Sequence, residues 1–512
     1  MRPLLLLSLA LFNAAVVSAQ TTNSATNIRS LSMRDCIDLV LRHNLGLQIS
    51  HLTVDMTGDM LRSAYGVYVP TYTFDATRSY EAAQGSIDDQ KFNPYFPADI
   101  TTQKEGMDLG GQLPFGFSYD FGGFVSKSQV LTDFRTDPQD AADFAGGIRS
   151  SNDLAAADGL QMRQHLLKDF WIDADREQIL ARRLDLKVSQ ATLRLQVMQT
   201  LLAVELAYYD LIGAREKIRV QEQAVELRRQ FVSETQRRIE VGESPVLDSA
   251  QAQTQLQNAL TALTVAREGY SISQNRLIGL LTDDFKAWVG VDLQPADALE
   301  APPPKLNRSD SFQSALATRP DLLEARLQVQ KCGAMVKFRF NQLFPSLDLV
   351  GGYGGLGANS DSSSTMSDAI SFRNPEYTYG VVLSFPLYNL SGQNDYRASK
   401  AAKKIAELQL QEAEQAVLLE VADCVCHVES CFSQVASTHQ AAAYAEQALS
   451  AENEKLVNGF TTTFVVLEFQ EILTGARTAE IQAKTDYEKS LAQLAFADGT
   501  IMQRHHLDLV IK

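Results

Sequence analysis

An internal repeat constrains the fold of this chain more than any other feature of its sequence. Gly459 lies 217 positions after Gly242, and nine residues that follow Gly242 recur at the same spacing. These residues are Gln253, Leu256, Ala259, Thr261, Ala262, Ala266, Tyr270, Ser273 and Leu277, and their counterparts are Gln470, Leu473, Ala476, Thr478, Ala479, Ala483, Tyr487, Ser490 and Leu494. Each half therefore has the same order of parts: a moderate helix, a β region, a long helix, a tight turn and a second moderate helix.

The N-terminal residues have the pattern of a secretory signal peptide. Arg2 precedes the apolar run 4–12, and Val17-Ser18-Ala19 supplies small residues for cleavage. The alternative, a membrane-anchoring helix, is disfavoured because this apolar run is short for a membrane span. The expected segments are the signal peptide at 1–19, a first structural repeat at 20–283, an inter-repeat linker at 284–308, a second structural repeat at 309–498 and a C-terminal tail at 499–512.

The long helices show a seven-residue apolar period. Such a strict period predicts left-handed supercoiling, as in coiled-coil helices packed side by side. The positions are Val197, Val204, Leu211, Ile218, Val225, Val232 and Ile239 in the first half, and Val421, Val428, Val435, Ala442, Leu449 and Leu456 in the second. The expected long helices are 173–240 and 391–458, and the expected moderate helices are 31–68, 246–283, 309–343 and 462–498. Two moderate helices stacked end to end would match one long helix.

The β regions alternate between apolar and polar residues. Tyr377, Tyr379 and Val381 alternate with Thr378, Gly380 and Val382, and the stretch after Pro70 alternates in the same way. About ten residues of apolar-out, polar-in alternation are typical of strands in an outer-membrane barrel, although a soluble sandwich strand has a similar pattern. The expected strands are 70–80, 159–168, 346–353 and 377–388, with extracellular loops at 81–106 and 354–376.

A further alternating stretch, 108–130, has two interpretations: a barrel strand or an extracellular β insertion. The chain must return to the helical side, and 159–168 preserves the parity of the two faces. We therefore expect 159–168 to be the returning strand and 108–130 to be an insertion. Four strands cannot close a pore, so we expect a trimer with a twelve-stranded β-barrel, four strands per chain, continuous with a long α-helical barrel. Asp75 and Asp348 are expected to face the barrel lumen.

Charge and motifs exclude several classes of function. The formal net charge is −16, which disfavours binding to nucleic acid. No phosphate-binding glycine motif and no nucleophile elbow occur, so we expect neither an enzyme nor a cofactor. On a helix, Cys424, His427 and Cys431 share one face near Cys426, but Cys424 and Cys431 lie ~10 Å apart along the axis. Packing is therefore favoured over a metal site.

At several sites the sequence resembles the TolC-type outer-membrane efflux protein (outer membrane factor) family. The two helix openings, 31–37 and 310–316, resemble each other and the family, and Arg319-Pro320-Asp321-Leu322 follows the second. Pro70 and Pro345 stand at the helix-to-strand joints. Gln164-His165-Leu166-Leu167-Lys168 resembles a family segment in which Pro replaces His165. The family's two helix-turn-helix tips are matched by Val241-Gly242 with 246–248 and by Asn458-Gly459 with 465–468.

The resemblance implies a homotrimer in the outer membrane of a Gram-negative bacterium, surrounded by outer-membrane lipid, with its helical part in the periplasm. It also implies docking to a periplasmic adaptor protein and an inner-membrane pump of the RND or ABC type. The residues expected to contact the adaptor are Gly242, Glu243, Ser244, Gly459, Phe460 and Thr461. Asp248 and Glu468 would form an acidic ring at the periplasmic entrance, or alternatively a solvated helix face.

The expected function is passive conduction of a substrate through the outer membrane, as the channel component of a tripartite efflux or type I secretion system. The alternatives are a periplasmic adaptor (membrane-fusion) protein and a structural periplasmic coiled coil. An adaptor would need one helical hairpin with β-rich flanking domains, whereas this sequence has two hairpins. The sequence leaves the exported substrate open between drugs, metal ions, polysaccharide and protein.

Overall fold

The computed structural model describes residues 27–83, 87–88, 93–94, 97–133, 148–241, 245–304, 306–359 and 361–507. The expected signal peptide at 1–19 lies outside these residues. The chain divides into two compact units, which we describe separately. The sheet unit contains 46–199, 306–426 and 494–512, and the hairpin unit contains 1–45, 200–305 and 427–493.

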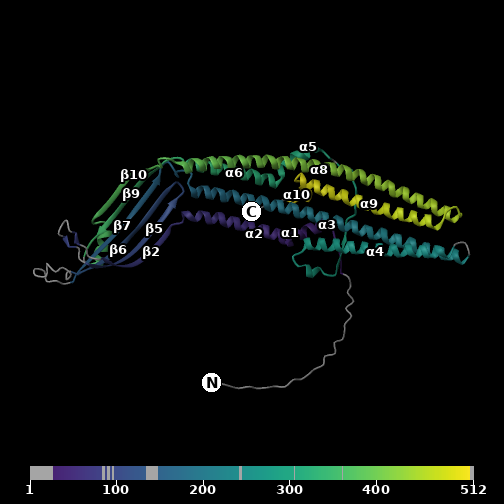
Figure 1. The fold of residues 1–512 in the computed structure, drawn as a ribbon, viewed down its shortest axis with the longest axis horizontal. Helices are drawn as coiled ribbons and strands as arrows, with labels where there is room; N and C mark the ends of the chain where they lie inside the picture. Colours follow the sequence, from purple (N-terminus) through teal and green to yellow (C-terminus); the bar gives the residue numbers. More distant parts are fainter. Residues whose placement is uncertain are drawn as a thin grey trace, which may run out of the picture. The chain divides into compact units, whose positions relative to one another are not determined.

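The sheet unit is built on one antiparallel sheet of six strands (Figure 1). The order across the sheet is β10-β9-β7-β6-β5-β2. The two strands of the second repeat therefore lie together at one side, next to the four strands of the first repeat. The bounds are β2 Thr71–Ala83, β5 Ala98–Leu113, β6 Phe117–Asp133, β7 Ile148–His165, β9 Ser346–Gly357 and β10 Pro375–Ser384. A short separate hairpin pairs β3 (Ile87–Asp88) with β4 (Asn93–Pro94).

The expectation of four strands per chain is wrong, because the sheet has six. Residues 108–130 are not an insertion: they form the end of β5 and most of β6, which pair with β2 and β7. The loop expected at 81–106 is also partly wrong, since β5 begins at Ala98. The hairpin of β5 and β6 adds two strands that run in opposite directions, so the chain still returns to the helical side of the sheet. The returning strand itself is confirmed, since β7 ends at His165.

Helices of the sheet unit start or end close to the strands. α2 (Leu45–Ala64) and the 3₁₀ helix η1 (Tyr65–Tyr68) lead into β2, and α6 (Pro320–Asn341) leads into β9. The other helices are α5 Arg308–Thr318, α7 Ser362–Ile370 and α10 Ile501–Arg504. The long helices α3 (Ala174–Glu240) and α8 (Leu390–Val457) begin after β7 and β10, within one residue of their predicted bounds.

The hairpin unit contains the ends of α3 and α8 and the helices that follow them. These are α4 (Val246–Leu281), the 3₁₀ helix η3 (Phe285–Trp288) and most of α9 (Thr463–Ala497), and the unit also contains α1 (Met33–His43). Nine of the thirteen seven-residue positions are buried, and Val204 and Val428 have no exposed surface. Ile218, Val232, Ile239 and Leu456 are half-buried. Val225 packs with Ala259 and Leu263 of α4, and Leu449 packs with residues of α9. The repeating apolar positions therefore hold each helical hairpin together.

The linker between the repeats contains a strand. β8 (Val291–Pro295) pairs in parallel with β1 (Asn27–Leu31), with Asn27 opposite Val291. Tyr208 of α3 is fully buried beside this pair, and its hydroxyl donates to the carbonyl oxygen of Leu31 or to Asp297 Oδ2. Among the described residues, no helix has the length and apolar character needed to cross a membrane.

Candidate functional site

The two faces of the sheet have opposite chemistry. The strand register places one apolar residue of each strand in a single row across the sheet, and this row lies on what we call the apolar face. The row is Tyr72, Leu109, Phe121, Leu160, Tyr353 and Tyr377. Most of these side chains are exposed, for example Tyr377 at 70%. An exposed apolar face of this extent marks a surface that contacts something other than water.

The opposite face, which we call the polar face, consists of polar residues and glycine. Its rows are Thr73, Asp108, Gly122, Gly159, Gly354 and Glu376, and Thr71, Gly110, Asp120, Gln161, Gly352 and Thr378. Residues of both rows line a hollow of about 780 Å³. A sheet with one apolar and one polar face is suited to separate lipid from water.

Both carboxylates expected in the lumen belong to the polar face, but Asp348 is held by a neighbouring side chain. Asp348 is only 7% exposed, and its Oδ1 lies 2.6 Å from Nδ1 of His165 on the neighbouring strand β7. Asp75 is half-buried and lies over Gly106 of β5. The carboxylates of Asp108 and Asp120 line the polar hollow instead. Sequence reasoning missed them because it assigned 108–130 to an insertion.

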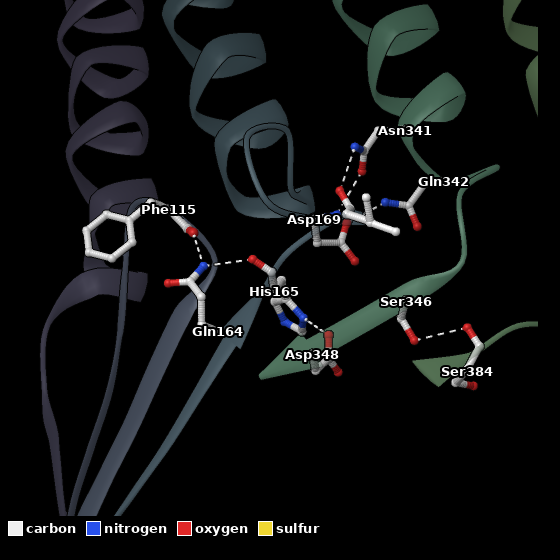
Figure 2. A network of polar contacts seen from close by, with 10 residues as sticks. Phe115, Gln164, His165, Asp169, Asn341, Gln342, Ser346, Asp348 and Ser384 are labelled. Atoms are coloured by element: carbon white, nitrogen blue, oxygen red, sulfur yellow. Dashed lines mark hydrogen bonds and ion pairs between the residues drawn. The ribbon is translucent and has the colours of Figure 1, made fainter. Parts of the chain in front are cut away.

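A network of polar contacts joins the sheet to the helices (Figure 2). Gln164 Nε2 donates to the carbonyl oxygen of Phe115 in the β5–β6 turn, at 2.8 Å. The backbone N–H of Asp169 donates to Oδ1 of Asn341 at the end of α6, at 2.8 Å. Ser346 Oγ donates to the carbonyl oxygen of Ser384, across the ends of β9 and β10. These contacts fix the strand ends at the point where α3 and β9 begin.

The glycine expected at the second helix tip ends α8 by a left-handed turn. Gly459 has φ +75°, its N–H donates to the carbonyl of Leu456, and the N–H of Phe460 donates to that of Lys455. This pair of bonds is a Schellman motif, for which glycine is preferred because it has no Cβ. Phe460 is 83% exposed and Thr461 is half-buried. The first-tip residues Gly242, Glu243 and Ser244 lie outside the described residues.

The two expected entrance carboxylates have different surroundings. Asp248, in the first turn of α4, is half-buried, and its Oδ2 accepts from Oγ1 of Thr463 at 3.0 Å. Glu468 is exposed on α9. The bond to Thr463 joins the start of α4 to the start of α9, so it connects the two tips. Thr463 was missed because its sequence context gives no sign of a partner from the other repeat.

Large apolar side chains are exposed at both tips. Val246 and Leu247 begin α4, Val457 ends α8, and Phe460 and Phe464 flank the start of α9; each is at least 61% exposed. We call these five residues the tip patch. Their exposure in one chain is the property expected of a surface that another protein covers.

The cysteines of α8 differ in exposure: Cys431 is buried, Cys424 is half-buried and Cys426 is exposed. Burial raises the pKa of Cys424 to about 11, and it also raises that of Cys431, whose Sγ lies 3.7 Å from Nε2 of His427. Nη2 of Arg308 lies 3.3 Å from Sγ of Cys426. In the described part of the chain, no three His, Cys, Asp or Glu residues are arranged to hold a metal ion.

Comparison with known proteins places this fold in a family. The sequence pattern described as "Outer membrane efflux protein" matches residues 159–282 and 312–500, which is more than half of the chain. The chain belongs to the outer membrane efflux protein family. It therefore lies in the outer membrane, and the efflux function expected from the sequence is confirmed at the level of the family.

Two named relatives are similar over most of their length. The outer membrane efflux protein BepC of Brucella suis biovar 1 is 26% identical over 346 residues, covering 67% of this chain and 71% of BepC. The outer membrane protein TolC of Vibrio cholerae is 25% identical over 369 residues, covering 70% of this chain and 80% of TolC.

Solved structures share the fold at lower identity. The CmeC outer membrane channel of Campylobacter jejuni has a TM-score of 0.65 and 14% identity, and the match covers 98% of this chain and 94% of CmeC. The outer membrane protein VceC of Vibrio cholerae has a TM-score of 0.65 and 16% identity, covering 91% of this chain and 96% of VceC. The fold predicted from the sequence is therefore confirmed apart from its strand number.

Proposed function

We propose that the chain is the outer-membrane channel component of a tripartite efflux or type I secretion system. Three copies would form a water-filled duct that conducts substrate passively, while an inner-membrane pump of the RND or ABC type supplies the energy. The observation that carries this proposal is the two-faced sheet. Its apolar face would contact outer-membrane lipid, and its polar face, with Asp108 and Asp120, would line the water-filled passage.

The proposal assigns the tip patch to a periplasmic adaptor protein. The tips are the helix ends of the hairpin unit. The patch consists of large side chains that are each at least 61% exposed. Aromatic and aliphatic anchors of this kind are the usual centre of a protein–protein interface. The residues expected at this contact are those of the patch together with Gly242, Glu243, Ser244, Gly459 and Thr461.

The bond between Asp248 and Thr463 supports a role for the tips in controlling the entrance. A contact between the two hairpins of one chain holds their ends together, and its loss would let them separate. Glu468 is exposed and would add negative charge near the same end. Three copies of each carboxylate would favour the entry of cations.

The function is tested by deleting the gene and restoring it on a plasmid. Restored export of a pump substrate, together with detergent-extracted trimers in the outer-membrane fraction, is the expected result. A soluble periplasmic monomer would overturn the proposal and favour the structural coiled coil instead.

Docking is tested with a variant of the tip patch. Phe460→Ser is expected to reduce co-purification of the adaptor without changing the amount of trimer, because Phe460 is the most exposed aromatic residue at the tip. Tyr444→Ser is the matched control, since Tyr444 is also an exposed aromatic residue of the hairpin unit, on α8 before its end. Equal retention of the adaptor by both variants would place docking elsewhere.

A further inference from the structure

The hairpin formed by β5 and β6 spans the whole height of the sheet. β5 has 16 residues and β6 has 17, whereas β9 and β10 have 12 and 10. β5 pairs with all 13 residues of β2, and β6 pairs with β7 from Phe117 to Asp133. The hairpin is therefore an integral pair of strands in the middle of the sheet, and β2 could not pair with β7 in its presence.

The turn of this hairpin is fixed at the helical end of the sheet (Figure 2). The N–H of His165 donates to the carbonyl oxygen of Gly116 at 3.0 Å, and the side chain of Gln164 donates to that of Phe115. Gly116 has φ +70°, and a Cβ at this position would lie 2.6 Å from the carbonyl oxygen of Asp169. The turn is therefore packed closely against the segment that leads into α3.

The hairpin also continues both faces of the sheet without interruption. Leu109 and Phe121 stand in the apolar row between Tyr72 and Leu160. Asp108 and Asp120 belong to the polar face and line its hollow. Any boundary between lipid and water that applies to β2 and β7 must therefore apply to β5 and β6 as well.

The two outer strands of the sheet have unpaired edges. β2 and β10 are the ends of the strand order, and within the described residues neither has a neighbour on its outer side. A strand edge with free N–H and C=O groups cannot face lipid, so a sheet with an apolar face must close. The two edges differ, and a contact between unlike surfaces of identical copies forms a ring when the rotation closes.

We propose that three copies of the chain close an eighteen-stranded barrel, in which the β2 edge of each copy pairs with the β10 edge of the next. The partner at each edge is thus a second copy of this chain. The proposal rests on the duct function proposed above and replaces the twelve strands expected from the sequence. Six strands from each copy supply the total.

The added strands widen the exit. With strands ~4.8 Å apart and tilted by ~40°, twelve strands enclose a backbone diameter of about 24 Å and eighteen strands about 36 Å. The cross-section of the exit is then about twice as large. The outer-membrane part of this duct would admit bulkier cargo than a barrel with four strands per chain.

Fluorescence quenching by lipids tests whether the hairpin lies in the membrane. Trp171 and Trp288 are replaced by Phe, and single tryptophans are introduced by Phe121→Trp, Tyr72→Trp or Asp120→Trp in the full-length protein. The trimers are reconstituted in vesicles that contain a lipid with a nitroxide on its acyl chain. Phe121→Trp and Tyr72→Trp, which share the apolar row, are expected to be quenched to a similar extent, and Asp120→Trp much less.

The outcomes separate this proposal from the duct function. Quenching of Tyr72→Trp without quenching of Phe121→Trp would place the hairpin outside the lipid and overturn the eighteen-stranded barrel, while the duct function would stand. Absence of quenching at both positions would overturn both proposals. Electron cryomicroscopy of the unmodified trimer in lipid nanodiscs is expected to count eighteen strands; twelve would overturn the barrel, whatever the quenching result.

Discussion

At the scale of single residues, the joint between sheet and helices depends on groups whose roles come from distant parts of the chain. His165 could be recognised from the sequence as a departure from a family segment, but its partner Asp348 could not, since 183 positions separate them. Gly116 is a similar case. Only its left-handed φ and the approach of Asp169 show why glycine stands in the turn.

Gly116→Val is expected to destabilise the protein. A residue with a Cβ is strained at φ +70° and would collide with the carbonyl oxygen of Asp169, so the free energy of unfolding should fall by about 1–3 kcal/mol. The control is Gly351→Ala in β9, where a Cβ would meet no atom within 4 Å. The midpoint of thermal unfolding measures both variants, and equal midpoints would contradict the packing described for the turn.

Cys36, which is buried, and Cys424, which is half-buried, are expected to resist alkylation. Burial raises the pKa of Cys36 to about 12 and that of Cys424 to about 11, so hardly any thiolate, the reactive form, exists at pH 8. Mass spectrometry after treatment with iodoacetamide should find both unmodified in the folded protein. In urea all five cysteines should react. Rapid modification of Cys36 before unfolding would contradict its burial.

At the scale of elements, the sequence predicts helices far better than strands. The seven-residue period continues over 197–239 of α3 and 421–456 of α8, and the bounds of both helices are predicted within one residue. The strand pattern is shorter and has a period of two, which any two-faced sheet satisfies. The alternation at 108–130 is visible in the sequence, but the sequence alone does not show that it belongs to β5 and β6, which pair with β2 and β7.

The junction of α5 and α6 depends on one buried cation. The side chain of Arg319 is 8% exposed, and its guanidinium donates to Asp321 and, at 2.5 Å, to Glu420 of α8. It also donates to the carbonyl oxygen of Ala497. These contacts join α6, α8 and the last residue of α9 around one side chain.

Arg319→Met is expected to lower the free energy of unfolding by about 1–3 kcal/mol, because it removes a buried donor from two half-exposed carboxylates and from the carbonyl oxygen of Ala497. The control is Arg62→Met, since Arg62 pairs with Asp59 in solvent and its loss should have almost no effect. Helical circular dichroism during heating measures both. Equal midpoints of thermal unfolding for Arg319→Met and Arg62→Met would show that Glu420 and Asp321 find other donors.

At the scale of the whole molecule, the acidic residues of the polar face would decide which ions pass most easily through the proposed duct. Asp108 and Asp120 would each be present three times around the proposed duct, and carboxylate rings favour cations. Sequence reasoning expected Asp75 and Asp348 to face the lumen, and of these Asp348 is 7% exposed and lies against His165.

The double variant Asp108→Asn with Asp120→Asn is expected to reduce selectivity for cations about twofold or more. The zero-current potential across a planar bilayer in a KCl gradient measures this. Arg163→Gln, which removes a positive charge from the same hollow, should shift the potential in the opposite direction. Identical potentials for the wild type and both variants would mean that the polar face does not determine ion selectivity.

The parallel pair of β1 and β8 sets an order of events for folding. Within the sheet, β2, β5, β6 and β7 of the first repeat pair in the order in which they occur along the chain. Each of these pairs can therefore form as soon as its own residues are available. β1 is different, since Asn27 must wait for Val291, which is synthesised 264 residues later. The first strand of the chain is thus among the last of its repeat to find a partner. β1 can pair with β8 only after the linker between the repeats has been synthesised, so this pairing is a late step of folding.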